Sequence, residues 1–132
     1  QLAEIDDRLR HVKAAIQQYP DADINWMKEV KALEKLKHAI DLSLWGDYHK
    51  SSRDVETLPS TGGRIETIVY QCWYSTSDVT STQKEQLALA KVEYAQIRTK
   101  VDELLMRVVE LEKKMNLKGI PYTPARQDWK ID

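Results

Sequence analysis

The chain has 132 residues, of which 20 are basic and 21 acidic, so its net charge at neutral pH is −1. This length suits one domain, and so balanced a charge gives no field that would attract nucleic acid. No apolar run approaches the roughly 20 residues of a membrane span, and no signal peptide is recognisable. The single cysteine, Cys72, has no partner for an internal disulfide, which leaves the compartment undecided.

Two antiparallel helices are predicted at the start of the chain, over residues 1–18 and 23–45. Tyr19 precedes Pro20, which disfavours helix, and Asp23 is expected to be the next N-cap. Apolar residues recur at helical spacing in both segments. The first stripe comprises Leu2, Ile5, Leu9, Val12 and Ile16, and the second Trp26, Val30, Leu33, Ile40 and Leu44. Arg8 is expected at the surface. Lys37 interrupts the second apolar stripe, and its ammonium group should extend from there to water.

A long polar connection, residues 46–63, precedes a short predicted helix over 63–75. Ile65, Ile68, Val69, Cys72 and Trp73 fall at helical spacing and form one apolar stripe. We expect this stripe to hold the helix against the bundle, with the thiol buried and inert. The β-branched residues leave a strand as an alternative.

The last predicted helix, residues 81–117, has the strongest pattern. Thr80 and Gln83 match a capping box at its start. Apolar residues then repeat at spacings of 3 and 4 over more than three heptads. They are Leu87, Ala90, Tyr94, Ile97, Val101, Leu104, Val108, Leu111 and Met115. Gly119 fits a left-handed stop with Ile120 packing back onto Met115, and Pro121 prevents continuation.

These elements predict an all-α, up-down helical bundle of three long helices plus one short helix and a long polar loop. The bundle would occupy residues 1–118 and be followed by an extended C-terminal tail, 119–132. The short connection between the first two helices requires a hairpin. We expect the short helix to fold against one end of the bundle.

The polar residues give no catalytic or metal-binding pattern, and no cofactor is implied. His38 lies near Glu34 and Asp41 on a helix, but no third ligand has a recognisable spacing. Cys72 and His49 could form a nucleophile pair only if the thiol left its apolar face. We therefore assign no catalytic residue and no metal ligand.

Aromatic residues are the better candidates for function, above all those that lie off the helical stripes. Trp73 and Tyr70 are expected to close the open end of the bundle, whereas Tyr74 and the tail aromatics should contact something outside it. Arg64, at the start of an apolar helix, should bond a carboxylate or helix-end carbonyls. The candidate interface residues are Arg64, Tyr70, Trp73, Tyr74, Tyr122, Arg126 and Trp129.

Several of these segments resemble a known family. They are Gly63-Arg64-Ile65, Ile68-Val69-Tyr70 with Trp73, Ser75-Thr76-Ser77, Thr82-Gln83, and Pro121-Tyr122-Thr123-Pro124-Ala125-Arg126. In this order they resemble the C-terminal helical segment of bacterial sortilin-like proteins, over about residues 38–126. Those proteins carry Asp-box (BNR) β-propellers and are often labelled glycosyl hydrolases. The sequence itself contains no Asp-box.

The resemblance implies a non-catalytic accessory bundle behind an upstream β-propeller of the same chain. It also implies a periplasmic, cell-surface or secreted location. The start at Gln1, already within a helical pattern, agrees with a segment of a larger protein. Such a domain would act by intramolecular docking or protein interaction. Two alternatives remain: a carbohydrate- or peptide-binding module, and part of a glycoside hydrolase whose active site lies in the propeller.

Overall fold

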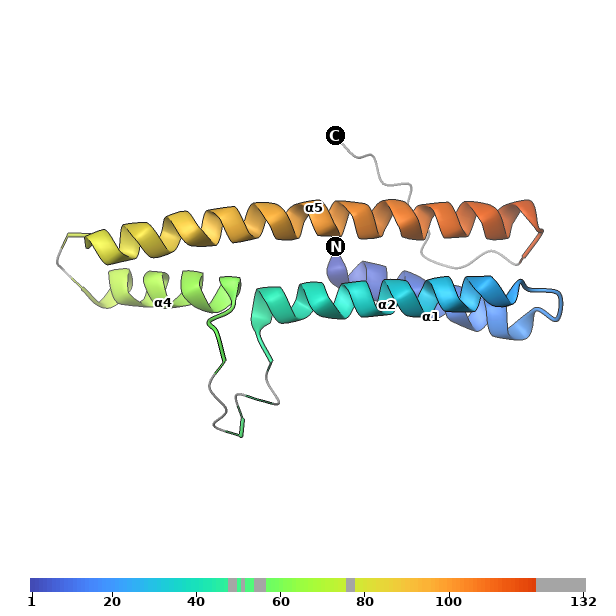
Figure 1. Cartoon of the computed structure of the whole chain (residues 1–132), viewed down its shortest axis with the longest axis horizontal. Coiled ribbons are helices and arrows are strands. Elements are labelled where there is room, and N and C mark those ends of the chain that lie inside the picture. Colours follow the sequence, from blue (N-terminus) through green and yellow to red (C-terminus); the bar gives the residue numbers. More distant parts are fainter. Residues whose placement is uncertain (48–49, 51, 54–56, 76–77, 121–132) are drawn as a thin grey trace. The chain divides into compact units, whose positions relative to one another are not determined.

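The protein is described by a computed structural model that covers residues 1–47, 50, 52–53, 57–75 and 78–120. Helix accounts for 81% of these described residues, and no strand occurs among them, which confirms the all-α class. The helices are α1 (Leu2–Gln18), α2 (Ile24–Trp45), α4 (Thr61–Tyr74) and α5 (Ser81–Leu117) (Figure 1). The segment expected to be a helix over 63–75 is therefore helical, and the strand alternative is wrong.

The helices divide between two compact units. Unit 1 contains residues 1–37 and, within the described part, 101–120. Unit 2 contains the described residues of 38–100. Both α2 and α5 contribute residues to each unit.

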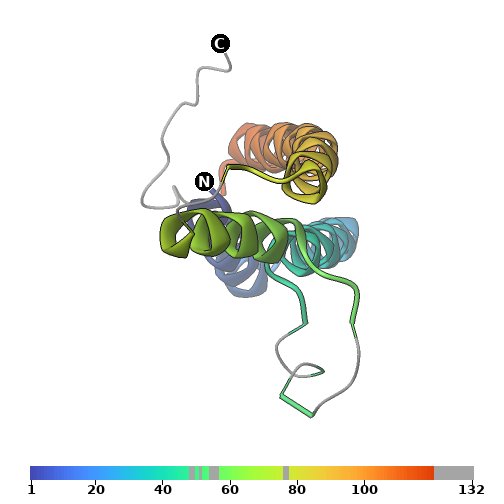
Figure 2. The ribbon, with the colours of Figure 1, turned by 90° about the vertical axis from the view of Figure 1, so that its left-hand side faces the viewer.

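Unit 1 is a three-helix bundle built from α1, the first part of α2 and the last part of α5 (Figures 1 and 2). Two ion pairs, Lys13–Glu34 at 2.7 Å and Lys37–Asp6 at 3.1 Å, show that α1 and α2 run antiparallel. The predicted stripes supply most of the buried core. Its hydrophobic residues are Ile5, Leu9, Val12, Ile16, Trp26, Val30, Leu33, Val101, Leu104, Leu105, Val108, Leu111, Met115 and Ile120.

One polar pair lies inside this core. Arg8, expected at the surface, is only 3% exposed and pairs with Glu112, which is equally buried. The Arg8 Nε donates to one carboxylate oxygen at 3.0 Å and Nη2 to the other at 2.5 Å. The fork geometry satisfies both carboxylate oxygens, which allows two charges to be buried together. Sequence periodicity missed this pair because its partners lie 104 residues apart.

The helix ends follow the local signals. The backbone N–H of Asn25 donates to the Asp23 carboxylate at 2.8 Å, as expected of the residue before α2. Gly46 and Gly119 adopt positive φ angles of 79° and 69° just beyond α2 and α5. The N–H of Ile120 donates to the Met115 carbonyl at 3.2 Å. This bond brings Ile120 back to Met115, as predicted for the end of the helix.

Unit 2 is smaller and combines the end of α2 with α4 and the first part of α5. Helix α4 lies alongside these first turns of α5 and runs antiparallel to them (Figures 1 and 2). It begins at Thr61, two residues earlier than predicted, because the Ser60 side chain caps it by accepting from the Gly63 N–H at 3.1 Å. Gly62 and Gly63 therefore lie within the first helical turn and not in the polar connection.

Candidate functional site

The face that α4 turns toward α5 is mostly polar, with Ile68 as an apolar member, and Arg64 lies on it. The Arg64 Nη1 donates to the Gln86 side-chain oxygen at 2.6 Å, and its Nε lies 3.5 Å from Glu93 Oε2. That second contact is an ion pair without a hydrogen bond, because Nε has no hydrogen-bond partner in the structure. Thr61, which is buried, donates its hydroxyl to the same Glu93 oxygen at 3.0 Å. The expectation that Arg64 binds a carboxylate is confirmed.

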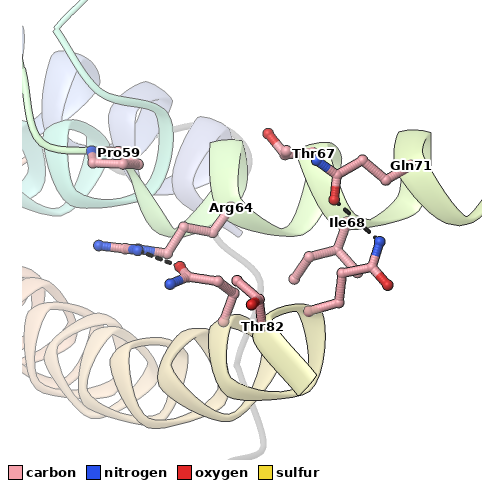
Figure 3. Close-up of a pocket in the computed structure, with 8 residues that line it drawn as sticks. Pro59, Arg64, Thr67, Ile68, Gln71 and Thr82 are labelled. Atoms are coloured by element: carbon pink, nitrogen blue, oxygen red, sulfur yellow. Dashed lines mark hydrogen bonds between the residues drawn. The ribbon is translucent and has the colours of Figure 1, made fainter. Parts of the chain in front are cut away.

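A second polar contact joins the opposite end of α4 to α5. The Gln83 side-chain nitrogen donates to the Gln71 side-chain oxygen at 3.2 Å (Figure 3). Gln83 also completes the predicted capping box with Thr80. Its Oε1 accepts from the Thr80 N–H at 2.9 Å, and its own N–H donates to the Thr80 hydroxyl at 3.2 Å. One glutamine side chain therefore caps α5 and links it to α4.

A shallow pocket of about 270 Å³ lies between these two contacts (Figure 3). Its lining consists of Pro59, Arg64, Thr67, Ile68, Gln71, Thr82, Gln83 and Gln86. A second pocket of about 260 Å³ lies on the other side of Arg64 and includes Glu93 and Lys100. A polar ligand in either pocket would compete with bonds that Arg64 already makes inside the protein. The polar contacts around the two pockets therefore hold α4 and α5 together.

The opposite side of α4 is apolar and exposed, contrary to expectation. The predicted stripe was to pack against the bundle. Its Ile68 does lie toward α5, where it lines the pocket, but Ile65 is 38%, Val69 51% and Trp73 81% exposed. Cys72 is exposed as well, so the prediction of a buried thiol is wrong. The polar contacts of Thr61, Arg64 and Gln71 with α5 all lie on one side of α4, and most of the apolar stripe lies outside that side.

The aromatic candidates of α4 therefore form a surface and do not close a bundle end. Trp73 was expected to fill that end together with Tyr70, yet Tyr70 is 64% exposed and Trp73 still more so. Tyr74, expected to face outward, is 76% exposed. The Tyr70 and Tyr74 rings lie one helical turn apart, with centroids 4.6 Å from each other. The two rings therefore contact each other on a solvent-exposed face of α4.

The first part of α5 departs from its predicted stripe in a similar way. Ala90 and Ile97 are buried as expected, whereas Leu87 is 39% and Tyr94 53% exposed. Gln83, Gln86 and Glu93 contact α4. Together with the buried Ala90 and Ile97 they form a different series, which also recurs at spacings of 3 and 4. Apolar periodicity does not single out Glu93, Gln86 or Thr61, because all three are polar. Polar residues at the same spacing were the available signal.

The remaining candidates lie elsewhere. Tyr122, Arg126 and Trp129 fall outside the described residues, as does His49. Within the described part of the chain, no three histidine, cysteine or acidic side chains come together as a metal site requires. No helix in that part is both long and apolar enough to cross a membrane.

Comparison with known proteins gave no match to any family model, curated protein or solved structure.

Proposed function

We propose that this chain is a non-catalytic interaction domain in which unit 1 provides a stable scaffold and unit 2 presents a contact surface. The observation that carries this proposal is the uneven distribution of apolar side chains. Among the described residues, the large hydrophobic side chains exposed outside unit 2 are Ile24, Met106 and Leu117. The other exposed ones belong to unit 2.

Burial within the units supports the same proposal. Among the described apolar residues, unit 2 buries Ile40, Ala90 and Ile97, whereas unit 1 buries fourteen. Exposed apolar residues that are contiguous on a surface are typical of protein–protein contact sites. Tyrosine and tryptophan, which α4 exposes, are enriched at the energetic centres of such sites.

The polar residues of unit 2 have a structural role in this proposal. Arg64 of α4 donates a hydrogen bond to Gln86 of α5 and forms an ion pair with Glu93 of α5. These contacts fix α4 with most of its apolar stripe directed away from α5. In this proposal the pocket residues hold the contact surface in place and do not convert a substrate.

The resemblance to sortilin-like propeller proteins suggests the biological setting. In that setting the domain would follow an exported β-propeller and dock against it or against another protein. Contacts between domains of one chain typically bury on the order of 600 to 1,500 Å². The exposed face of α4 offers apolar residues suited to such a contact.

The test joins the chain to a sortilin-like β-propeller at its N-terminus and compares melting temperatures with those of the isolated chain. Docking should raise the melting temperature of the helical domain, because a partner that binds only the folded state stabilises it. Trp73→Ala should reduce that gain, whereas Leu117→Ala, which changes an equally exposed residue of unit 1, should leave it intact. Tyr122→Ala and Trp129→Ala extend the test to the tail. An unchanged melting temperature on joining would argue against docking to a propeller.

A carbohydrate-binding module is the second candidate, and the exposed Trp73, Tyr70 and Tyr74 favour it because aromatic faces stack on sugar rings. Titration with glycans, followed by tryptophan fluorescence, distinguishes the two. A saturable change that Trp73→Ala abolishes would support sugar binding. Hydrolysis of a glycoside by the chain alone would contradict both proposals.

A further inference from the structure

We infer that Gln83 is a conformational link in unit 2, which makes the last turns of α4 and the first turn of α5 open and close together. The last turns of α4 carry Tyr70, Trp73 and Tyr74, so the link controls how firmly the aromatic part of the contact surface is held. This consequence rests on the proposed function, whereas the link itself depends only on bonds within unit 2.

The Gln83 side chain bonds both helices at once, and each of its two polar atoms has a different partner. Its Oε1 accepts from the N–H of Thr80, which directly precedes α5, and its Nε2 donates to Gln71 Oε1 on α4 (Figure 3). The Thr80 hydroxyl in turn accepts from the Gln83 N–H. A movement of the Gln83 side chain would therefore break the cap of α5 and the contact with α4 together.

The direction of these bonds follows from which groups can only donate. A backbone N–H cannot accept a hydrogen bond, so the Thr80 N–H requires the oxygen of the Gln83 amide. The Gln83 nitrogen is then the atom left to face α4, and as a donor it requires the oxygen of Gln71. Each bond thus sets the orientation of the next, and hydrogen bonds connected in this way are energetically coupled.

The link lies where α4 ends and α5 begins. Gln71 is about one turn from the end of α4, and Gln83 lies in the first turn of α5. Thr61 and Arg64 make further polar contacts with α5 at the start of α4. Those contacts do not involve Gln83, so they can hold the start of α4 while its end opens. Opening is therefore expected in the last turns of α4 and not along the whole helix.

The experiment measures amide hydrogen exchange by NMR on the whole chain, without a partner and at low concentration. Gln71→Ala changes α4, yet it should also speed exchange over residues 84–86 of α5 about threefold or more. Thr80→Ala removes the hydroxyl that caps α5 and should speed exchange over residues 71–74 of α4 by about the same factor.

Two threonines of the same unit provide matched controls. The Thr99 hydroxyl donates to a carbonyl within α5, and the Thr67 hydroxyl donates to one within α4. Thr99→Ala should leave exchange in α4 unchanged, and Thr67→Ala should leave exchange in the first turn of α5 unchanged. Thr67 is the stricter control, because it lines the same pocket as Gln71 and Gln83.

A cycle of charge substitutions tests the link while both side chains keep their length. Gln71→Glu keeps an acceptor for the Gln83 nitrogen. Gln83→Glu keeps an acceptor for the Thr80 N–H, and its other oxygen can accept from the Gln71 amide once that amide turns over. Each single variant should therefore change exchange little. The double variant brings two carboxylates together and should speed exchange in both segments by more than the product of the single effects.

Two outcomes would overturn the inference. One is exchange in the first turn of α5 that does not respond to Gln71→Ala, and the other is a double variant whose effect equals the product of the single effects. Circular dichroism checks that each variant stays helical, as expected because Gln71 and Thr80 are exposed. The proposed function is judged separately by the melting-temperature gain on joining to the propeller, so failure of the link leaves that test unaffected.

Discussion

At the scale of single residues, the buried pair of Arg8 and Glu112 is the least expected feature of unit 1. Both side chains are about 3% exposed, and Arg8 Nη1 has no hydrogen-bond partner. Taking two charges out of water has a cost that pairing only partly offsets. The pair therefore acts to define how α1 meets α5 and contributes little to net stability.

This reasoning predicts the effect of removing one partner. Glu112→Leu leaves a buried guanidinium without its carboxylate and should lower the free energy of unfolding by about 3–5 kcal/mol. The double variant Arg8→Met with Glu112→Leu should lose much less, because no charge is left buried alone. Urea denaturation followed by circular dichroism measures both.

The control for this cycle is Glu110→Leu. Glu110 pairs with Lys114 at 3.4 Å on an exposed surface, where an ion pair contributes little. Its change should stay within about 0.5 kcal/mol. Additive losses in the double variant would show that Arg8 and Glu112 are not coupled.

At the scale of elements, the start of α4 depends on a close approach to the end of α2. A Cβ added at Gly62 would lie 2.6 Å from the Leu44 carbonyl oxygen and 3.2 Å from the Trp45 ring. Backbone atoms cannot move aside as a flexible side chain can. A glycine is therefore required here for contact, and not for an unusual backbone conformation.

We predict that Gly62→Ala destabilises unit 2 even though alanine is favoured over glycine inside a helix by about 1 kcal/mol. The clash should outweigh this preference and cost about 1–3 kcal/mol. Amide hydrogen exchange across α4, with the free energy of unfolding, measures the loss. Gly63→Ala is the comparison: its Cβ meets the Ser60 hydroxyl at 3.1 Å, so it should be better tolerated. Stabilisation by Gly62→Ala would contradict the contact.

At the scale of the whole molecule, the two units differ in how much apolar surface they bury. The core of unit 1 includes Leu104, Val108 and Leu111, all 0% exposed. Unit 2 joins α4 to α5 chiefly through polar side chains. Because burial is the main favourable contribution to folding, stability should be uneven along the chain.

Hydrogen exchange should reveal this difference directly. At concentrations low enough to exclude association, amides of α5 around Leu104–Leu111 should be protected at least tenfold more strongly than those of α4 around Thr67–Gln71. The long helix allows both regions to be compared in one experiment, and residues 81–100 of α5 should be intermediate. Equal protection in α4 and in the unit 1 core would show that the two units open together.

The sequence by itself determined the helices and their ends. Spacings of 3 and 4, the Thr80–Gln83 capping box and the positive-φ glycines are local features, and each acts within a few residues of its own helix. The same periodicity correctly predicted the core of unit 1, because three long stripes of similar length bury one another there. The need of Arg64 for an acceptor could be predicted from an equally local feature, its position at the start of an apolar helix.

The tertiary structure alone decided which side of α4 is covered. Its apolar stripe was visible in the sequence, but the direction in which it points depends on Gln86 and Glu93, which lie on another helix. The same holds for Arg8 and Glu112, which are far apart along the chain and adjacent in the fold. Periodicity shows that a helix has an apolar side, whereas only contacts between distant residues determine whether that side faces a core or a partner.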